Sequence, residues 1–132
     1  PVLVADRENG SAGRGRAVRA ASAQKTLTSR LLASRRLAGC VHRELHDFVL
    51  KSGYEVESKG VRKAPFYVLA ATGMPAVLAE IGYCSNPGDA FLLRKSEYRQ
   101  AVARGLAEGI LAWAGRERER ATAERSTGTR IR

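Results

Sequence analysis

Residues 74–87 read MPAVLAEIGYCSNP, and this short stretch says more about the expected fold than any other part of the chain. Its apolar run at 76–83, AVLAEIGY, has the length of a β-strand, but Glu80 lies within it. Burying a carboxylate is costly unless the group is paired with a cation, bound to a metal or used in chemistry. The stretch therefore predicts a strand and poses the question of what Glu80 does.

The neighbouring pattern predicts an α/β layer structure. A second apolar run, FYVLAAT at 66–72, precedes the first, and both runs suit a sheet covered on both faces. Apolar residues at three- and four-residue spacings predict long helices over 27–50 and 90–114. Residues 1–9 add a brief strand-like run, and the Gly-, Ser-, Ala- and Arg-rich residues 10–25 indicate a loop or a poorly fixed helix. We therefore expect two long helices and two or three strands.

Composition limits the class of protein. The 132 residues have room for one domain, and a formal net charge of +10 favours anionic partners or a solvated Arg-rich surface. Residues 116–132 have almost no apolar content, which predicts a basic, disordered tail. Cys40 and Cys84 lack disulfide or metal-site spacing and are expected to be separate thiols. We find no apolar run long enough for a transmembrane segment and no signal peptide in the sequence.

A family resemblance rests on a block of matching residues. These are Gly60-Val61-Arg62, Phe66-Tyr67-Val68-Leu69, Met74-Pro75-Ala76-Val77-Leu78, Glu80, Tyr83 and Ser85-Asn86-Pro87. The segments DREN (6–9), SRRLAGCVHREL (34–45) and EYRQAVARGLAEGILAW (97–113) agree with it. The chain thus resembles, over roughly residues 4–114, the C-terminal half of the catalytic domain of zinc-dependent N-acetylmuramoyl-L-alanine amidases of the amidase-3 family. The resemblance implies the C-terminal part of a three-layer α/β sandwich with a mixed sheet, with residues 1–115 as a partial catalytic domain.

The resemblance also implies a role for Glu80. It matches the family's catalytic glutamate, which takes a proton from water and delivers it to the leaving amine. The alternative is a buried Glu80 paired with an Arg or Lys from a neighbouring element. Ser85 and Asn86, just past the expected strand, are candidates for shaping a substrate groove.

Zinc is the cofactor that the resemblance implies, but its ligands are absent from this sequence. The family's ligands are a His in a Gly-His-Gly-Gly turn, a Glu on the helix after it and a His in a Ser-x-His element, and none of these motifs occurs here. They would lie upstream of the counterpart of Pro1. A milder departure is Lys59, where the family usually has Arg. We therefore assign no metal ligand.

His42 and His46 have a spacing compatible with a shared metal ion. The stretch HRELH places them four residues apart on one helical face. However, the order is not H-E-x-x-H, Glu44 lies on a different side of the helix, and no third ligand is evident. We interpret both as surface or semi-buried histidines.

The expected function follows from the resemblance. It implies a cell-wall hydrolase that cleaves the amide bond between N-acetylmuramoyl and L-alanine in peptidoglycan, in the periplasm or outside the cell. A missing N-terminal half of the domain would then be a further partner. The alternative is a truncated, non-catalytic remnant that at most binds the wall or another protein. A specific nucleic-acid partner is not expected, because few aromatic residues accompany the arginines.

Overall fold

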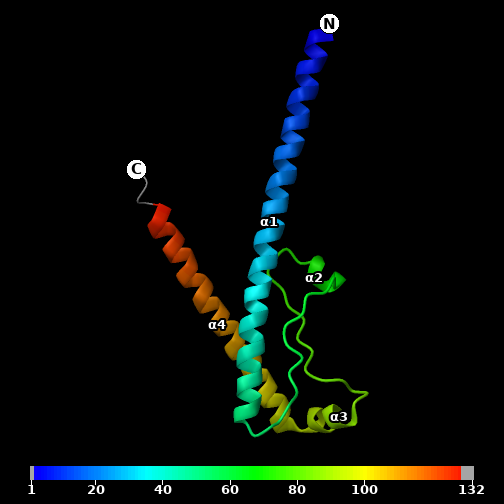
Figure 1. The fold of residues 1–132 in the computed structure, drawn as a ribbon, viewed down its shortest axis with the longest axis vertical. Helices are drawn as coiled ribbons and strands as arrows, with labels where there is room; N and C mark the ends of the chain where they lie inside the picture. Colours follow the sequence, from blue (N-terminus) through cyan, green and yellow to red (C-terminus); the bar gives the residue numbers. More distant parts are fainter. Residues whose placement is uncertain (1, 129–132) are drawn as a thin grey trace. The chain divides into compact units, whose positions relative to one another are not determined.

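Four helices make up the secondary structure of the described chain. The computed structural model describes the backbone of residues 2–128 and the side chains of residues 15–127. The helices are α1 (Val2–Lys51), α2 (Tyr67–Ala70), α3 (Pro87–Arg94) and α4 (Ser96–Gly128), as Figure 1 shows. The chain divides into two units, residues 1–33 and 34–132, and α1 begins in the first and ends in the second.

The core of the second unit lies between the end of α1 and the start of α4. Val49, Tyr98 and Val102 are its buried centre, each at most 5% exposed. Tyr54 packs edge-on against Tyr98, with ring centroids 5.1 Å apart. Partly buried residues surround this centre: Leu45, Tyr54, Val56, Leu92, Leu93 and Leu106. Contacts between these apolar side chains are the main stabilising element of the unit.

The helix pair is antiparallel and closely packed at two glycines. A Cβ atom on Gly109 would lie 2.5 Å from Val41 Cα, and one on Gly105 would lie 2.8 Å from Leu45 Cα. At the far end of the pair, Arg36 bonds Glu117. Residues later in α4 therefore contact residues earlier in α1, as in any antiparallel pair of helices. Glycine is required at 105 and 109 because a side chain there would collide with the backbone of α1.

The expected α/β sandwich is wrong for the described residues, because no strand occurs between residues 2 and 128. Residues 66–72 contain the short helix α2 and a turn, and residues 76–83 run without regular secondary structure. A strand needs a neighbouring strand to accept its backbone hydrogen bonds, and neither segment has one here. An apolar run of this length cannot by itself distinguish a strand from a buried helical segment.

Two other expected elements differ for reasons of helix propensity. Residues 2–25, expected as a strand-like run and a loop, belong to α1. Residues 116–128, expected as a disordered tail, continue α4, whereas 129–132 lie outside the described residues. Residues 116–128 are rich in Arg, Glu and Ala and residues 16–25 in Ala and Arg, all strong helix formers, whereas the glycines at 10, 13 and 15 disfavour a helix. The domain boundary after residue 115 stays a prediction.

Candidate active site

Glu80 lies in the irregular segment before α3 and is exposed to solvent. The Tyr83 hydroxyl donates a hydrogen bond to Glu80 Oε2 at 3.2 Å. The expectation of a buried carboxylate is therefore not met in this structure. The alternative, a pairing of Glu80 with Arg or Lys, is not met either, since no ion pair of Glu80 occurs among the described residues. An exposed carboxylate beside a phenol is free to meet a ligand from solvent.

The segment after Glu80 is fixed to the first turn of α3. The Tyr83 backbone N–H donates to Asp89 Oδ2 at 2.9 Å. Asn86 caps the helix, because its Oδ1 accepts from the backbone N–H groups of Gly88 and Asp89 at 2.9 and 3.1 Å. Pro87 follows at the first helical position, where its missing N–H costs nothing. We call residues 80–89 the Glu80 loop.

Gly82 has an unusual backbone angle and directly precedes Tyr83 and the turn at residues 84–85, where the Asn86 backbone N–H donates to the Tyr83 carbonyl oxygen at 2.9 Å. Gly82 has a φ of 148°, a value that L side chains rarely adopt. A Cβ atom there would meet Asp89 Cβ at 3.3 Å and Leu93 Cδ1 at 3.4 Å. The glycine in the sequence EIGY is thus needed both for its backbone angle and for space next to α3.

Ser85 and Asn86, the two candidate groove residues, have different surroundings. Both are exposed, and Asn86 has the structural role of capping α3. Sequence reasoning missed Tyr83 and Asp89 as hydrogen-bonding partners in this loop. The signal for Asp89 was present: SNPGD places an acidic residue in the first turn of a helix, where it is favourable. The contact from Tyr83 to Glu80 has no such signal in the sequence.

Apolar side chains lie exposed on both sides of Glu80. Leu78 is 49% exposed, Ile81 38% and Tyr83 52%. Upstream, the Ala76 backbone N–H donates to Ser34 Oγ at 3.1 Å, which attaches the segment to α1. The pocket lined by Phe48, Tyr54 and Arg104 contains no residue of the Glu80 loop. The candidate site is therefore a surface and not a cavity.

The described residues do not form a zinc site. No group of three or more His, Cys, Asp or Glu side chains comes close enough to hold a metal ion in the part of the chain whose side chains are described. His42 and His46 stack with their ring centroids 6.2 Å apart, and Ser58 Oγ lies 3.2 Å from His42 Nε2. Two imidazoles alone leave a zinc ion short of the three protein ligands usual even in catalytic sites.

The two cysteines are unpaired thiols, as the sequence indicated. Cys40 is buried in α1, where Arg116 Nη1 lies 3.6 Å from its Sγ, and Cys84 is exposed in the Glu80 loop. Among the described helices, none has a stretch that is both long and apolar enough to cross a membrane.

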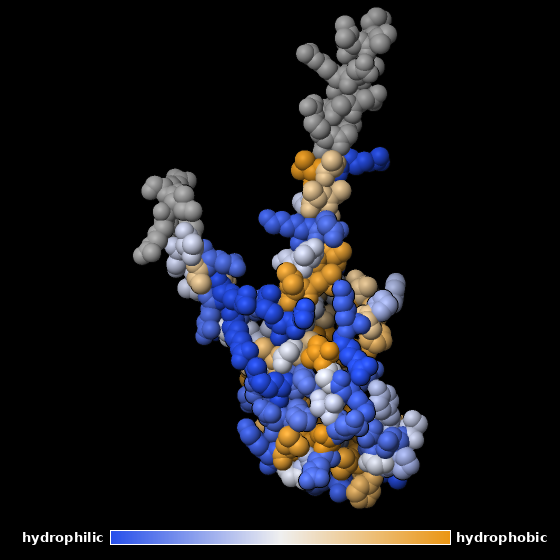
Figure 2. All heavy atoms as spheres, viewed as in Figure 1, coloured by the Kyte–Doolittle hydropathy of each residue, from blue (hydrophilic) through white to orange (hydrophobic). Residues whose placement is uncertain are grey.

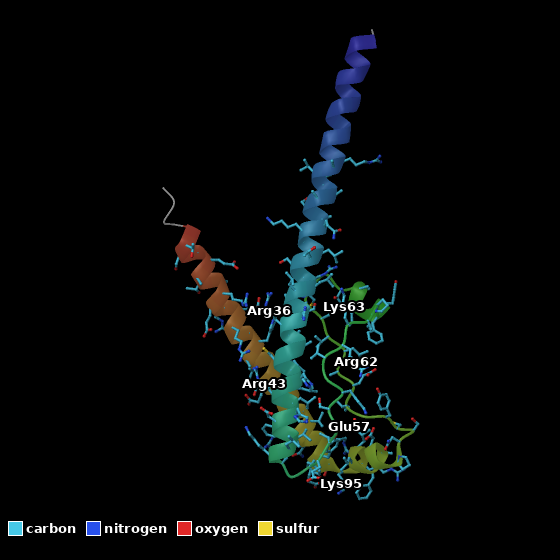
Figure 3. The ribbon with its side chains drawn as sticks, viewed as in Figure 1. Arg36, Arg43, Glu57, Arg62, Lys63 and Lys95 are labelled. Carbon is cyan, nitrogen blue, oxygen red and sulfur yellow. The ribbon has the colours of Figure 1, made fainter. Side chains whose placement is uncertain are left out.

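The shortest ion pair among the described residues lies outside the Glu80 loop. Arg36, labelled on α1 in Figure 3, donates from Nε and Nη2 to the two carboxylate oxygens of Glu117 on α4, at 2.6 and 2.8 Å. These hydrogen bonds lower the pKa of Glu117 and raise that of Arg36. Burial, followed by the charge of Asp89, raises the pKa of Tyr98.

Several curated proteins with similar sequences are named as cell-wall amidases. An uncharacterized protein, YqiI, of Bacillus subtilis is 38% identical over 58% of this chain and 35% of its own length. The N-acetylmuramoyl-L-alanine amidase CwlM of Bacillus licheniformis is 39% identical over 50% of this chain and 26% of its own length. AmiA of Escherichia coli, also named an N-acetylmuramoyl-L-alanine amidase, is 31% identical over 48% of this chain and 22% of its own length.

These matches span about a third or less of the length of each relative. No solved structure is similar to the chain at a significant level. The family model of N-acetylmuramoyl-L-alanine amidases, however, matches residues 7–112, which is most of the chain and includes the whole Glu80 loop. The chain therefore belongs to the N-acetylmuramoyl-L-alanine amidase family.

Proposed function

We propose that this chain is part of a peptidoglycan amidase domain that cleaves the amide bond between N-acetylmuramoyl and L-alanine. The observation that supports this is the family match over residues 7–112. The names of the relatives CwlM and AmiA point to the same reaction. The relatives' names and the family's cell-wall substrate favour action outside the cytoplasm, in the periplasm or beyond.

Glu80 is the proposed catalytic residue. Its carboxylate is exposed, so a substrate amide and a water molecule can both reach it. As general base it removes a proton from the attacking water, and as general acid it returns that proton to the leaving α-amino group of L-alanine. The Tyr83 hydroxyl, which donates to Glu80 Oε2, holds one carboxylate oxygen and leaves the other for the water.

Ser85 and Asn86 are the proposed substrate contacts next to Glu80. Both are exposed on the same loop, and the Asn86 amide nitrogen is free of the capping contacts made by its Oδ1. A zinc ion, the cofactor that the resemblance implies, would need ligands from outside the described residues, since these gather no group of three.

An assay of bond cleavage on purified peptidoglycan tests the proposal. Amidase action releases new L-alanine amino termini without new reducing sugar ends, which separates it from glycosidase action. In a protein that joins this chain to the zinc-ligand segment absent from it, we expect release of these termini, and we expect the Glu80→Gln variant of that protein to release them at least about 100-fold more slowly, the usual range for loss of a general base. Glu55→Gln removes the same charge from another exposed glutamate and should leave the rate unchanged.

Two results would overturn the proposal. If the protein that also contains the zinc-ligand segment releases no L-alanine termini in the presence of zinc, it is a non-catalytic member of the family. If it is active but Glu80→Gln and Glu55→Gln retain equal rates, the catalytic carboxylate lies elsewhere.

A further inference from the structure

The Asp89 carboxylate binds the loop that carries Glu80 and not the end of its own helix. Asp89 is the third residue of α3 after the cap at Asn86. At this position an acidic side chain commonly accepts a hydrogen bond from the backbone N–H of the capping residue. Here the Asn86 backbone N–H donates to the Tyr83 carbonyl oxygen at 2.9 Å, and Asp89 Oδ2 accepts from the Tyr83 backbone N–H at 2.9 Å. The Asp89 side chain therefore stabilises the position of Tyr83.

This contact connects an exposed residue to the packed part of the second unit. Tyr83 is 52% exposed, whereas Asp89 is half-buried. Leu92 and Leu93 of α3 pack against the buried core, so the helix that carries Asp89 is itself fixed. A hydrogen bond to an ionised acceptor is about twice as strong as one between neutral groups. Asp89 thus holds the Tyr83 backbone more firmly than its exposure alone would suggest.

The Tyr83 side chain transmits this fixed position to Glu80. Its hydroxyl donates to Glu80 Oε2 at 3.2 Å and is the one hydrogen-bond donor to that carboxylate among the described residues. Hydrophobic side chains are exposed among the hydrophilic ones of the second unit (Figure 2). Leu78 and Ile81, on either side of Glu80 in the sequence, are also exposed and offer its carboxylate no polar group. An exposed side chain without such a contact exchanges among several rotamers, so the Tyr83 hydroxyl selects the orientation of Glu80.

We propose that Asp89 is a positioning residue for the general base Glu80 and that it acts through Tyr83. This inference rests on the amidase function proposed above, in which Glu80 moves a proton between water and the leaving amine. A general base works only within hydrogen-bond reach of the proton that it removes, and a misplacement of about 1 Å can cost about 100-fold in rate. Asp89 needs no contact with the substrate for this role, because it sets where the Tyr83 hydroxyl lies.

The rotamer of Glu80 in the full chain tests the positioning without any assay of activity. Three-bond couplings about the Glu80 Cα–Cβ bond, measured by NMR, distinguish one rotamer from an average over several. We expect one preferred rotamer in the wild type and averaged couplings in both Tyr83→Phe and Asp89→Ala. Asp89→Asn should keep the wild-type couplings, because its amide oxygen can still accept from the Tyr83 N–H. Asp89→Ala should also speed hydrogen exchange of the Tyr83 amide by about 10-fold, the loss of one hydrogen bond to a charged group.

Arg99→Ala is the matched control for a purely structural effect on α3. Arg99 Nη1 donates to the carbonyl oxygens of Leu93 and Arg94 at 2.9 and 2.8 Å, at the opposite end of α3 from Asp89. Its removal weakens the helix without touching the contact between Asp89 and Tyr83. We expect the Glu80 couplings to stay at their wild-type values in Arg99→Ala. Equal averaging in Arg99→Ala and Asp89→Ala would reduce Asp89 to a structural residue of α3 and overturn the proposal.

Kinetics in the protein that also contains the zinc-ligand segment test the consequence for the reaction. We expect Asp89→Ala and Tyr83→Phe each to lower kcat by about 10-fold with little change in KM, and Asp89→Asn to restore most of the rate. The double variant should lose no more than either single variant, because the two residues act in one series of contacts.

The outcomes separate this inference from the proposed function. An active protein whose kcat is unchanged by Asp89→Ala would overturn the inference alone, and so would wild-type Glu80 couplings in the Asp89→Ala chain. A wild-type protein that releases no L-alanine termini would overturn the proposed function, and the role of Asp89 in proton transfer would fall with it.

Discussion

The contact of Gly109 with α1 gives a prediction whose magnitude follows from the structure. In an unhindered helix, Gly→Ala stabilises by about 1 kcal/mol, because alanine loses less backbone entropy. At Gly109 the new Cβ would lie 2.5 Å from Val41 Cα, 3.1 Å from Val41 N and 3.2 Å from Cys40 O. These are backbone atoms, which cannot rotate away, so α1 and α4 must separate. Overpacking of this kind costs about 1–3 kcal/mol.

Gly115→Ala is the matched control on the same helix. A Cβ atom on Gly115 would meet nothing within 4 Å. Both substitutions gain the same helix propensity, so the difference between their free energies of unfolding isolates the collision. We expect Gly115→Ala to stabilise by about 1 kcal/mol. We expect Gly109→Ala to be less stable than Gly115→Ala by about 1–3 kcal/mol.

Urea unfolding followed by circular dichroism measures this difference. With a dependence of about 1–3 kcal/mol per molar urea, the two midpoints should differ by about 1 M. Gly39→Ala, also with open space around it, provides a second control on α1. Equal midpoints for Gly109→Ala and Gly115→Ala would refute the close approach of the two helices at this position.

Three further predictions concern single contacts. Because a hydrogen bond from Arg36 lowers the pKa of Glu117, their ion pair should stabilise fully above the ordinary value of 4.5 and lose its effect as the pH falls through the lower folded-state value. The advantage of wild type over Glu117→Gln, about 0.5–1 kcal/mol in urea unfolding at pH 7, should therefore shrink as the pH is lowered below 4.5, and a constant difference would contradict this. Trp113 Nε1 is buried without a hydrogen-bond partner among the described residues. Trp113→Phe should therefore cost less than about 2 kcal/mol of unfolding free energy, because removal of the unpaired N–H offsets part of the lost ring packing, and a larger loss in calorimetry would contradict this. Asn86→Ala removes the cap and should destabilise α3 by about 1 kcal/mol, which faster amide hydrogen exchange in α3 would show. Asn86→Asp should keep the cap, and equal exchange in both variants would exclude a capping role.

The sequence predicted the helical part of the second unit better than the rest of the fold. Val49 and Tyr98 lie on apolar stripes with helical spacing, and both are buried where α1 meets α4. The family could also be predicted, because the residues around Glu80 form a long and specific block. The glycine contacts could not. A glycine within a helical pattern is compatible with a close approach, a kink or nothing at all, and only the structure places Val41 against Gly109.

The segment around Glu80 shows why pattern alone failed there. A strand is a property of two segments, since its backbone groups are satisfied only by a neighbour, whereas a helix satisfies its own. Residues 76–83 have the composition of a buried strand, but no described segment pairs with them, and Leu78 and Ile81 remain exposed. The cost expected for a buried Glu80 assumed that the sheet was present. Without a partner strand the same residues leave the carboxylate in solvent, beside Tyr83, and the chain after it is held by the hydrogen bond from Tyr83 N–H to Asp89 and by the cap of α3.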